Sequence, residues 1–173
     1  EDGSHIKGLL FNLFESQWPS LFNKPGFIKS MLTPIVKVKK GKTEKQFYSA
    51  KDYDFWKTNN DTKGFNVKYY KGLGTSTPSE AKQYFKELKI VDYTTNDECD
   101  SKSLHMAFSK NENSSNMRKN WLSNYDKNDT LDYTSKKISI SEFVHKDLKH
   151  FSNSDNLRSI PNIIDGFKPS QRK

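Results

Sequence analysis

The sequence has one cysteine, Cys99, among 173 residues. A single thiol excludes an internal disulfide, and without a second cysteine nearby it excludes a zinc finger as well. No apolar run approaches the roughly 18 residues needed to cross a bilayer. The charged start and apolar segment that direct secretion are also missing. We therefore expect a soluble, intracellular protein with no segment that spans a membrane.

Hydrophobic residues are scarce, at 32% of the chain, so a large core of its own is doubtful. An aromatic content of 13% argues against full disorder, because packed aromatic rings bury a large area each. Acidic residues are also fewer than basic ones: the chain has 21 Asp and Glu and 29 Lys and Arg, which gives a net charge of +8. Such a surface favours an anionic partner, and charge alone leaves both nucleic acid and an acidic membrane open.

Helical periodicity is clearest from Ser4 to Trp18, where apolar residues recur at three- and four-residue spacing. The predicted apolar stripe consists of Ile6, Leu9, Leu10, Leu13, Phe14 and Trp18. Three runs rich in β-branched and aromatic residues predict strands at 35–39, 46–48 and 65–70. Ser49 is placed to cap a short helix between the second and third of them. Strands that alternate with helices indicate an α/β layer.

Two capping boxes predict further helix starts. Residues 77–80 combine Thr, Glu three residues later and Pro at the first helical position, and residues 139–142 repeat the Ser-to-Glu spacing. The predicted stripe of the first of these helices is Ala81, Tyr84, Phe85 and Leu88. Between them, residues 92–131 are rich in Asn, Ser, Asp, Thr and Lys, which predicts a long polar connector with apolar anchors at 104–108 and 121–122.

The opening residues 2–8 (DGSHIKG) place a carboxylate at a helix N-terminus, where backbone N–H groups already favour anions. Asp2 could hold Mg²⁺, which binds through one or two carboxylates plus water and phosphate oxygens. Asp2 or Ser4 could equally act only as a helix cap. Further along, Lys71 precedes a Gly-x-Gly turn between a predicted strand and helix. That turn would let a phosphate approach the backbone, although such a turn is most often only a turn.

Basic pairs occur at Arg118-Lys119, just before Trp121, and in residues 168–173 (KPSQRK), which follow Gly166 and contain Pro169. Arginine grips a phosphate with two N–H groups and lysine adds a point charge, so such sites position nucleic acid without reading its sequence. A solvated charge run is the competing interpretation of each. The four histidines lack metal-ligand spacing and a nearby nucleophile, so chemistry alone gives none of them a catalytic role.

Taken in order, these phrases resemble the eukaryotic-type type IIA DNA topoisomerases. Residues 2–8 are similar to the end of the Asp-x-Asp-x-Asp-Gly-Ser-His signature of the TOPRIM domain, and residues 165–173 (DGFKPSQRK) to the start of the breakage-reunion region. Further similar phrases lie at 18–21 (WPSL), 33–38 (TPIVKV), 68–76 (KYYKGLGTS), 107–110 (AFSK), 151–156 (FSNSDN) and 158–162 (RSIPN). Since the chain begins at Glu1 and stops inside a basic phrase, we expect a fragment.

The resemblance implies three regions. Residues 1–92 would form the C-terminal part of a Rossmann-like, TOPRIM-type α/β region. Residues 93–135 would be a polar connector of helix and loop that carries a DNA-contacting basic pair. Residues 136–173 would begin the breakage-reunion region as a truncated winged-helix part.

The resemblance also implies an ATP-dependent homodimer in the nucleus, which relaxes, decatenates and unknots double-stranded DNA. It would cut both strands of one duplex, pass another through the break and reseal the first. Each strand is cut by a tyrosine that becomes linked to the 5′ phosphate, while Mg²⁺ on TOPRIM carboxylates stabilises charge at the scissile phosphate. The nucleophilic tyrosine and the ATP-binding domain fall outside residues 1–173, so we expect the fragment alone to be inactive.

Residue roles follow from the same resemblance. Asp2 matches a metal-site aspartate. The positions that match DNA contacts are Arg118, Lys119, Lys168, Lys71 and His5. Those that match the surroundings of the cleavage centre are Arg158, Asp165 and Arg172. Two other classes stay open: a non-catalytic basic nucleic-acid-binding module, and a primase or nuclease with TOPRIM chemistry, which residues 165–173 argue against.

Overall fold

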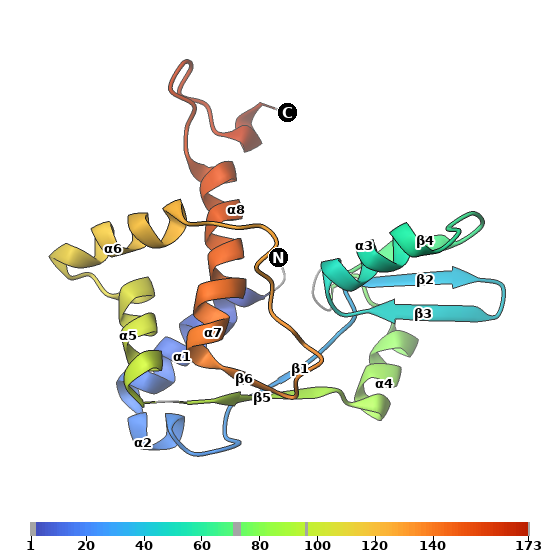
Figure 1. Cartoon of the computed structure of the whole chain (residues 1–173), viewed down its shortest axis with the longest axis horizontal. Helices are drawn as coiled ribbons and strands as arrows, with labels where there is room; N and C mark the ends of the chain where they lie inside the picture. The colour runs from blue at the N-terminus through green and yellow to red at the C-terminus, as the bar shows by residue number, and fades with distance from the viewer. Residues whose placement is uncertain (1–2, 71–73, 96, 173) are drawn as a thin grey trace. The chain divides into compact units, whose positions relative to one another are not determined.

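The computed structural model describes residues 3–70, 74–95 and 97–172, which divide into two compact units. The first unit comprises residues 1–3, 25–94 and 132–138, and the second comprises residues 4–24, 95–131 and 139–173. Nearly all the strands belong to the first unit and most of the helices to the second (Figure 1). The regional boundaries expected at residues 92 and 135 concern function and stay predictions.

One sheet of the first unit consists of the three strands predicted from the sequence. Strands β2 (Val36–Lys40), β3 (Thr43–Phe47) and β4 (Asn66–Tyr69) lie in the order β3-β2-β4, and both pairs are antiparallel. Helix α3 (Ala50–Asn59) follows β3, and the Ser49 hydroxyl caps it by accepting from the Asp52 N–H at 3.1 Å. The helix and the sheet share one hydrophobic cluster, formed by Val36, Val38, Phe47, Tyr53 and Trp56.

The other sheet of this unit was not predicted. Strands β1 (Lys29–Met31), β5 (Ile90–Thr94) and β6 (Lys137–Ser139) lie in the order β1-β5-β6. The β1–β5 pair is antiparallel and carries an ion pair between Lys29 and Asp92 at 3.1 Å. The mixed α/β class is therefore confirmed. The Rossmann-like expectation is not met by these strands, because that layer is built from parallel strands and the pairs β1–β5, β2–β3 and β2–β4 are all antiparallel.

Helix α4 (Pro78–Glu87) begins where the capping box predicted it. The Thr77 hydroxyl accepts from the Glu80 N–H at 3.3 Å, and the Glu80 carboxylate accepts from the Thr77 N–H at 2.7 Å. The predicted stripe is wrong in part: Tyr84 is buried, whereas Phe85 and Leu88 are exposed. The packed face of α4 is narrow because Glu80 and Tyr84, one turn apart, make its contacts with the lysines of the sheet.

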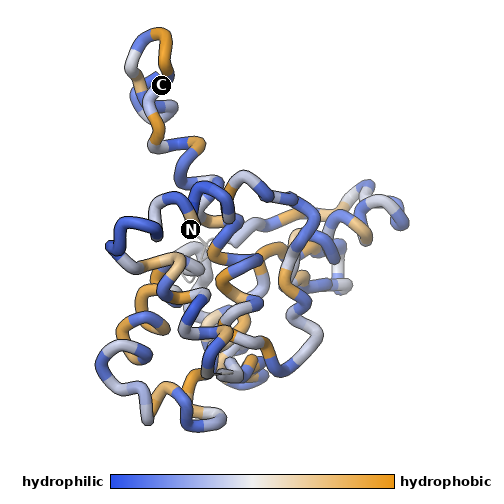
Figure 2. Tube along the Cα trace, turned by 60° about the vertical axis from the view of Figure 1, so that its left-hand side comes forward, coloured by the Kyte–Doolittle hydropathy of each residue, from blue (hydrophilic) through white to orange (hydrophobic). Residues whose placement is uncertain are grey.

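The second unit is helical. Its elements are α1 (Ser4–Gln17), α2 (Pro19–Phe22), α5 (Asp97–Phe108), α6 (Glu112–Ser123), α7 (Ile140–Phe143), a π-helical turn (Val144–Leu148), α8 (Lys149–Ser159) and a 3₁₀ turn (Pro169–Gln171). Two of these helices, α5 and α6, occupy the stretch expected to be a long polar connector. Burial of Leu104 and Met106 anchors α5 despite its polar composition. Hydrophobic residues are scattered in short stretches along the whole chain (Figure 2), which is why composition hid these helices.

Helix α1 forms as expected but packs through a different face. Ser4, Gly8 and Phe11 are buried, while five residues of the predicted stripe are between 43% and 59% exposed: Ile6, Leu9, Leu10, Leu13 and Trp18. Gly8 explains the choice of face. A Cβ atom at this position would lie 2.9 Å from Phe108 Cζ and 3.3 Å from Leu148 Cδ1, so any larger residue would force the ends of these side chains to shift.

We predict that Gly8→Ala destabilises the chain by about 1–2 kcal/mol. Alanine would improve helix propensity by up to roughly 1 kcal/mol, and the overpacking cost of about 1–3 kcal/mol outweighs that gain. Urea unfolding followed by circular dichroism measures the difference. Phe108→Leu removes the atom closest to the added methyl group, so the double variant should recover part of the loss. A Gly8→Ala chain as stable as the wild type would contradict the close approach.

Candidate nucleic-acid interface

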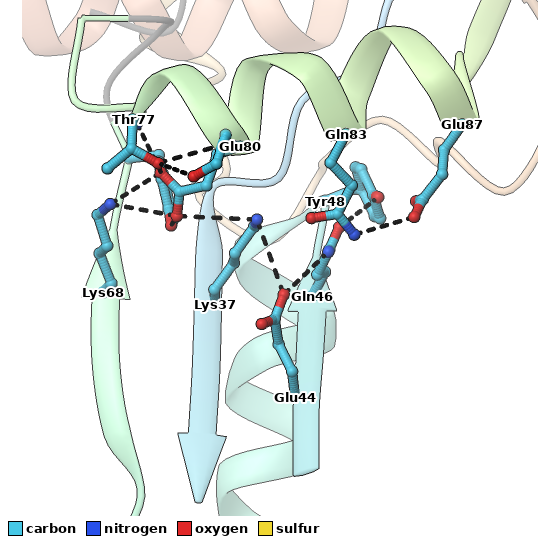
Figure 3. A network of polar contacts seen from close by, with 11 residues as sticks. Lys37, Glu44, Gln46, Tyr48, Lys68, Thr77, Glu80, Gln83 and Glu87 are labelled. Atoms are coloured by element: carbon cyan, nitrogen blue, oxygen red, sulfur yellow. Dashed lines mark hydrogen bonds and ion pairs between the residues drawn. The ribbon is translucent and has the colours of Figure 1, made fainter. Parts of the chain in front are cut away.

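Glu80 lies at the centre of a polar network in the first unit (Figure 3). Residues of this network lie on both sides of the predicted Gly-x-Gly turn in the sequence. The Glu80 carboxylate accepts from the Thr77 N–H, from Lys68 Nζ at 2.9 Å and from the Tyr70 hydroxyl. Thr77 begins α4, whereas Lys68 and Tyr70 lie on β4 and immediately after it. One carboxylate therefore joins the end of a strand to the start of the next helix.

Lys37 extends this network to the central strand. Its side chain is only 7% exposed, although it carries a charge. Lys37 Nζ lies 3.7 Å from a carboxylate oxygen of Glu44 and 3.9 Å from one of Glu80, and it stands 4.8 Å from the centroid of the Tyr84 ring. Two carboxylates and an aromatic face thus compensate for the water that the ammonium group loses on burial.

The pKa values in this network record the balance of burial and hydrogen bonding. Burial alone would raise the pKa of Glu80, but hydrogen bonds from the Thr77 N–H, the Tyr70 hydroxyl and Lys68 outweigh it and lower the pKa to about 2. Burial raises the pKa of Tyr70, and its bond to Glu80 raises it further. Glu80 is consequently charged and Tyr70 neutral across the physiological range.

In the second unit, a pocket of about 450 Å³ brings together three of the predicted DNA contacts: His5, Arg118 and Lys119. Aromatic and apolar side chains form part of its wall, including Phe108, Trp121 and Phe151. The Trp121 indole N–H, which can only donate, is buried and has no hydrogen-bond partner among the described residues. The basic side chains of this pocket suit an anionic ligand.

Phe151 links His5 to one of the residues predicted near the cleavage centre. The His5 ring stacks on the Phe151 ring with centroids 4.9 Å apart and planes 6° apart. The guanidinium carbon of Arg158 lies 5.9 Å from the centroid of the same ring, and Arg158 Nε pairs with Asp155 at 3.0 Å. Phe151 and Asp155 were missed as functional candidates; the stripe Leu148-Phe151-Asp155 at helical spacing was the signal that could have found them.

Arg118 is half-buried, and part of its guanidinium group has a structural role. Its Nη1 donates to the carbonyls of Ser109 at 2.9 Å and Met106 at 3.3 Å, and so satisfies acceptors at the C-terminal end of α5. The Nε and Nη2 groups have no partner within the described part of the chain. Lys119, the next residue, is exposed and is paired with no carboxylate among those residues. The pair thus presents one anchored and one unpaired cation.

Asp165 and Arg172 form an ion pair in the segment after α8. This pair spans the residues around Lys168, whose backbone N–H donates to the Gln171 side chain at 2.9 Å. Arg158 contacts Asp155 instead, so the three residues predicted around the cleavage centre divide between two ion pairs. Their predicted roles remain predictions.

Asp2 and Lys71 lie outside the described residues. In residues 3–70, 74–95 and 97–172 there is no group of three or more His, Cys, Asp or Glu side chains that could hold a metal ion. No helix in the described part of the chain is long and apolar enough to cross a membrane.

Residues 31–156 match the family described as the C-terminal associated domain of TOPRIM. The chain belongs to this family. Its sequence is 48% identical to DNA topoisomerase 2 of Plasmodium falciparum and 47% identical to that of Arabidopsis thaliana, over 99% of the chain in each case. The chain spans 12% of the length of both relatives. The resemblance expected from the sequence is thereby confirmed.

A solved structure agrees with this assignment to the TOPRIM-associated family. The DNA-binding, cleavage and re-ligation domain of Plasmodium falciparum topoisomerase II matches with a TM-score of 0.86 and 45% sequence identity. The match covers 98% of this chain and 23% of that one. Both units therefore have counterparts in that domain.

We predict that Glu80 makes the stability of the chain depend on acid pH. Its folded pKa of about 2 lies below the ordinary 4.5, so the unfolded chain takes up the proton first as the pH falls. Its contribution, up to about 3 kcal/mol, is complete above pH 4.5 and lost between pH 4.5 and about 2. Urea unfolding of wild type and Glu80→Gln should show a difference that shrinks over this interval.

Glu87→Gln is the matched control for this experiment. Glu87 lies on the same helix, is exposed, and accepts only from the Gln83 side chain at 2.9 Å among the described residues. Its substitution should leave a small difference from wild type without a trend in pH. If the difference between wild type and Glu80→Gln stayed constant down to pH 2, the network would not hold the carboxylate charged.

Proposed function

We propose that this chain is the part of an ATP-dependent type II DNA topoisomerase that contributes phosphate contacts to the cleaved duplex and one flank of its magnesium site. The observation that carries this proposal is the match of 98% of the chain to a domain whose name states DNA binding, cleavage and re-ligation. The basic pocket of the second unit supports it, because three cationic candidates from two helices converge there.

The complete enzyme would relax, decatenate and unknot DNA by breaking both strands of one duplex, passing another through and resealing the first. It would act as a homodimer in the nucleus. Residues 136–173 would begin the winged-helix part of its breakage-reunion region. The curated relatives are about eight times as long as this chain, which leaves room for the nucleophilic tyrosine and the ATP-binding domain, and the chain alone would not cleave DNA.

The residues of this chain would act by holding the scissile region of the DNA. Cleavage concentrates negative charge on the phosphate under attack, so fixed cations lower the barrier if they are already in place. Arg158 and Arg172 would supply oriented N–H groups, with Asp155 and Asp165 fixing their direction. Lys119 and Lys168 would neutralise neighbouring phosphates. Mg²⁺, bound with help from Asp2, would supply Lewis-acid stabilisation of the same charge.

A non-catalytic DNA-binding module is the alternative. Its lysines and arginines would position a duplex in the same way, but Asp2 would have no role in activity. The two functions differ in what the longer protein does, since the module predicts DNA binding that is indifferent to Mg²⁺ and brings no strand passage.

We expect the chain to bind duplex DNA weakly and without sequence preference, with affinity that falls as salt rises. Replacing Lys119 by Gln should reduce the slope of log K against log salt by about 0.9, the value of one lost phosphate contact. Fluorescence anisotropy of a labelled duplex between roughly 50 and 200 mM salt measures this. Lys86→Gln, an exposed lysine of α4, is the control and should bind like wild type. Binding that is indifferent to salt would contradict phosphate contact.

In the longer protein, we expect Asp2→Ala to demand more Mg²⁺ for relaxation of supercoiled DNA, and Lys168→Ala to slow it at every Mg²⁺ concentration. The first effect reflects a missing metal-site carboxylate and the second a missing phosphate contact. ATP-dependent relaxation and decatenation under titrated Mg²⁺ distinguish them. A wild-type protein unable to relax or decatenate DNA would overturn the enzyme proposal and leave the binding module.

A further inference from the structure

The β2–β3 hairpin ends in a narrow, strongly basic tip. Lys40, the last residue of β2, faces Thr43, the first of β3, so only Gly41 and Lys42 form the turn. Gly41 has φ +58°, as the first position of a two-residue hairpin turn of type II′ requires. Figure 1 shows this tip at the end of the hairpin that points away from α4. The hairpin tip, as we use the term, consists of Lys39, Lys40, Lys42, Lys45 and Lys63.

The charge of the hairpin tip is almost unopposed. All five lysines are exposed, and none forms an ion pair with a carboxylate of the described residues. Two carboxylates lie near them in the sequence. Glu44 is engaged by the buried Lys37 at 3.7 Å and by Gln46 at 3.2 Å, and Asp61 accepts the Lys63 backbone N–H at 3.0 Å. Both therefore serve local structure, and the lysines remain without partners of opposite charge.

Neighbouring groups hold two of these side chains in place. Lys40 Nζ donates to the Lys63 carbonyl at 2.9 Å, which joins the turn before β4 to the tip, and it lies 5.4 Å from the centroid of the Phe65 ring. Lys45 Nζ lies 5.5 Å from the centroid of the Phe47 ring. The aromatic rings thus attract the two ammonium groups, while both lysine residues stay exposed. Ordering a long side chain on binding costs conformational entropy, and part of that cost is already met here.

We propose that the hairpin tip is a further contact surface for the phosphate backbone of duplex DNA. This inference rests on the proposed function and adds a surface in the first unit to the pocket in the second. A two-stranded β-ribbon is narrow enough to enter the major groove, which is about 12 Å wide. Lysines at its end meet phosphates as point charges, so the contact contributes affinity and salt dependence without reading sequence.

Duplex DNA fits this surface better than an anionic membrane does. Surface segments that bind membranes combine basic residues with exposed Trp, Phe or Leu that enter the acyl boundary. Residues 39–45 (KKGKTEK) contain no apolar side chain, and the rings of Phe65 and Phe47 near the tip lie beneath the ammonium groups of Lys40 and Lys45. The tip therefore offers charge alone, which is what a phosphate backbone requires.

The test compares two triple variants of the 173-residue chain with equal charge. Lys39, Lys42 and Lys45 are replaced by Gln in one; Lys40 is kept because of its bond to the Lys63 carbonyl. Lys51, Lys82 and Lys86, exposed lysines on α3 and α4 of the same unit, are replaced by Gln in the other. Circular dichroism and thermal unfolding verify that both variants fold like wild type.

We expect the tip variant to bind a fluorescent duplex roughly tenfold more weakly, with a slope of log K against log salt reduced by about 2–3. The control variant should keep an affinity close to that of wild type. Equal affinities of the two variants would overturn the hairpin-tip proposal while leaving the proposed function intact. Salt-independent binding by the wild type would instead count against the proposed function itself.

Lysine acetylation followed by mass spectrometry gives a second readout that needs no substitution. Bound duplex should protect Lys39, Lys42 and Lys45 and leave Lys51, Lys82 and Lys86 reactive. A parallel arm uses vesicles that contain phosphatidylserine. If the tip variant lost vesicle binding but kept its affinity for DNA, or if DNA protected both sets of lysines equally, the assignment of the tip to DNA would be wrong.

Discussion

The carboxylate of Glu80 is the constraint on which the first unit depends. It joins strand β4 to the start of α4 and, through Lys37, joins both to the central strand β2. Removing one partner of such a buried ion pair lowers the free energy of unfolding, because the charge left behind has neither water nor a counter-ion. The network therefore acts as a unit, and it fixes the base of the hairpin whose other end carries the unpaired lysines.

Antiparallel packing of two helical runs plays the corresponding part in the second unit. The His5 ring stacks on Phe151, and Gly8 lies against Leu148. The ring centroids of Phe11 and Phe143 are 5.0 Å apart. Successive residues of α1 thus contact progressively earlier residues of the segment 143–151, so the two run antiparallel. The close approach that Gly8 allows thus determines where His5, one turn earlier, meets the Phe151 ring. A residue with no side chain positions one of the cationic candidates.

Local signals in the sequence predicted local structure well. The Thr77 capping box, the hydroxyl caps of Ser49 and Ser139 and the three strands of one sheet depend on neighbours in the sequence, and the structure has them. The second half of the predicted box at residues 139–142 is not formed, because the Glu142 side chain pairs with Lys146. The second sheet could not be predicted in the same way, because β1, β5 and β6 are short and their pairing joins residues about 60 positions apart, as in Lys29 with Asp92. Helices α5 and α6 were hidden for a related reason: a few buried anchors such as Leu104 stabilise them, and their composition is that of a connector.

Apolar periodicity predicted the existence of α1 and α4 correctly but not the faces they bury. In α1 the decisive residue is Gly8, which no hydrophobic pattern reveals. In α4 the decisive residues are Glu80 and Tyr84, whose contacts are largely polar. The candidate site residues were predicted in a different way. Their identities came from sequence phrases, whereas their grouping around one pocket required the fold, since His5 and Arg118 are more than 110 positions apart.

The cations of this chain divide into two kinds, and the division has a physical consequence for DNA binding. Arg158 and Arg172 are paired with aspartates, so a phosphate that approaches them meets a reduced net charge but a guanidinium of fixed orientation. Lys119 and the lysines of the hairpin tip have no carboxylate partner among the described residues, so on the proposed binding of DNA they would supply the greater part of counter-ion release. Under the proposed function, affinity and its salt dependence would come chiefly from the lysines, whereas the arginines would align a phosphate for chemistry. Affinity for a duplex can then change through the lysines without disturbing the geometry that the arginines hold.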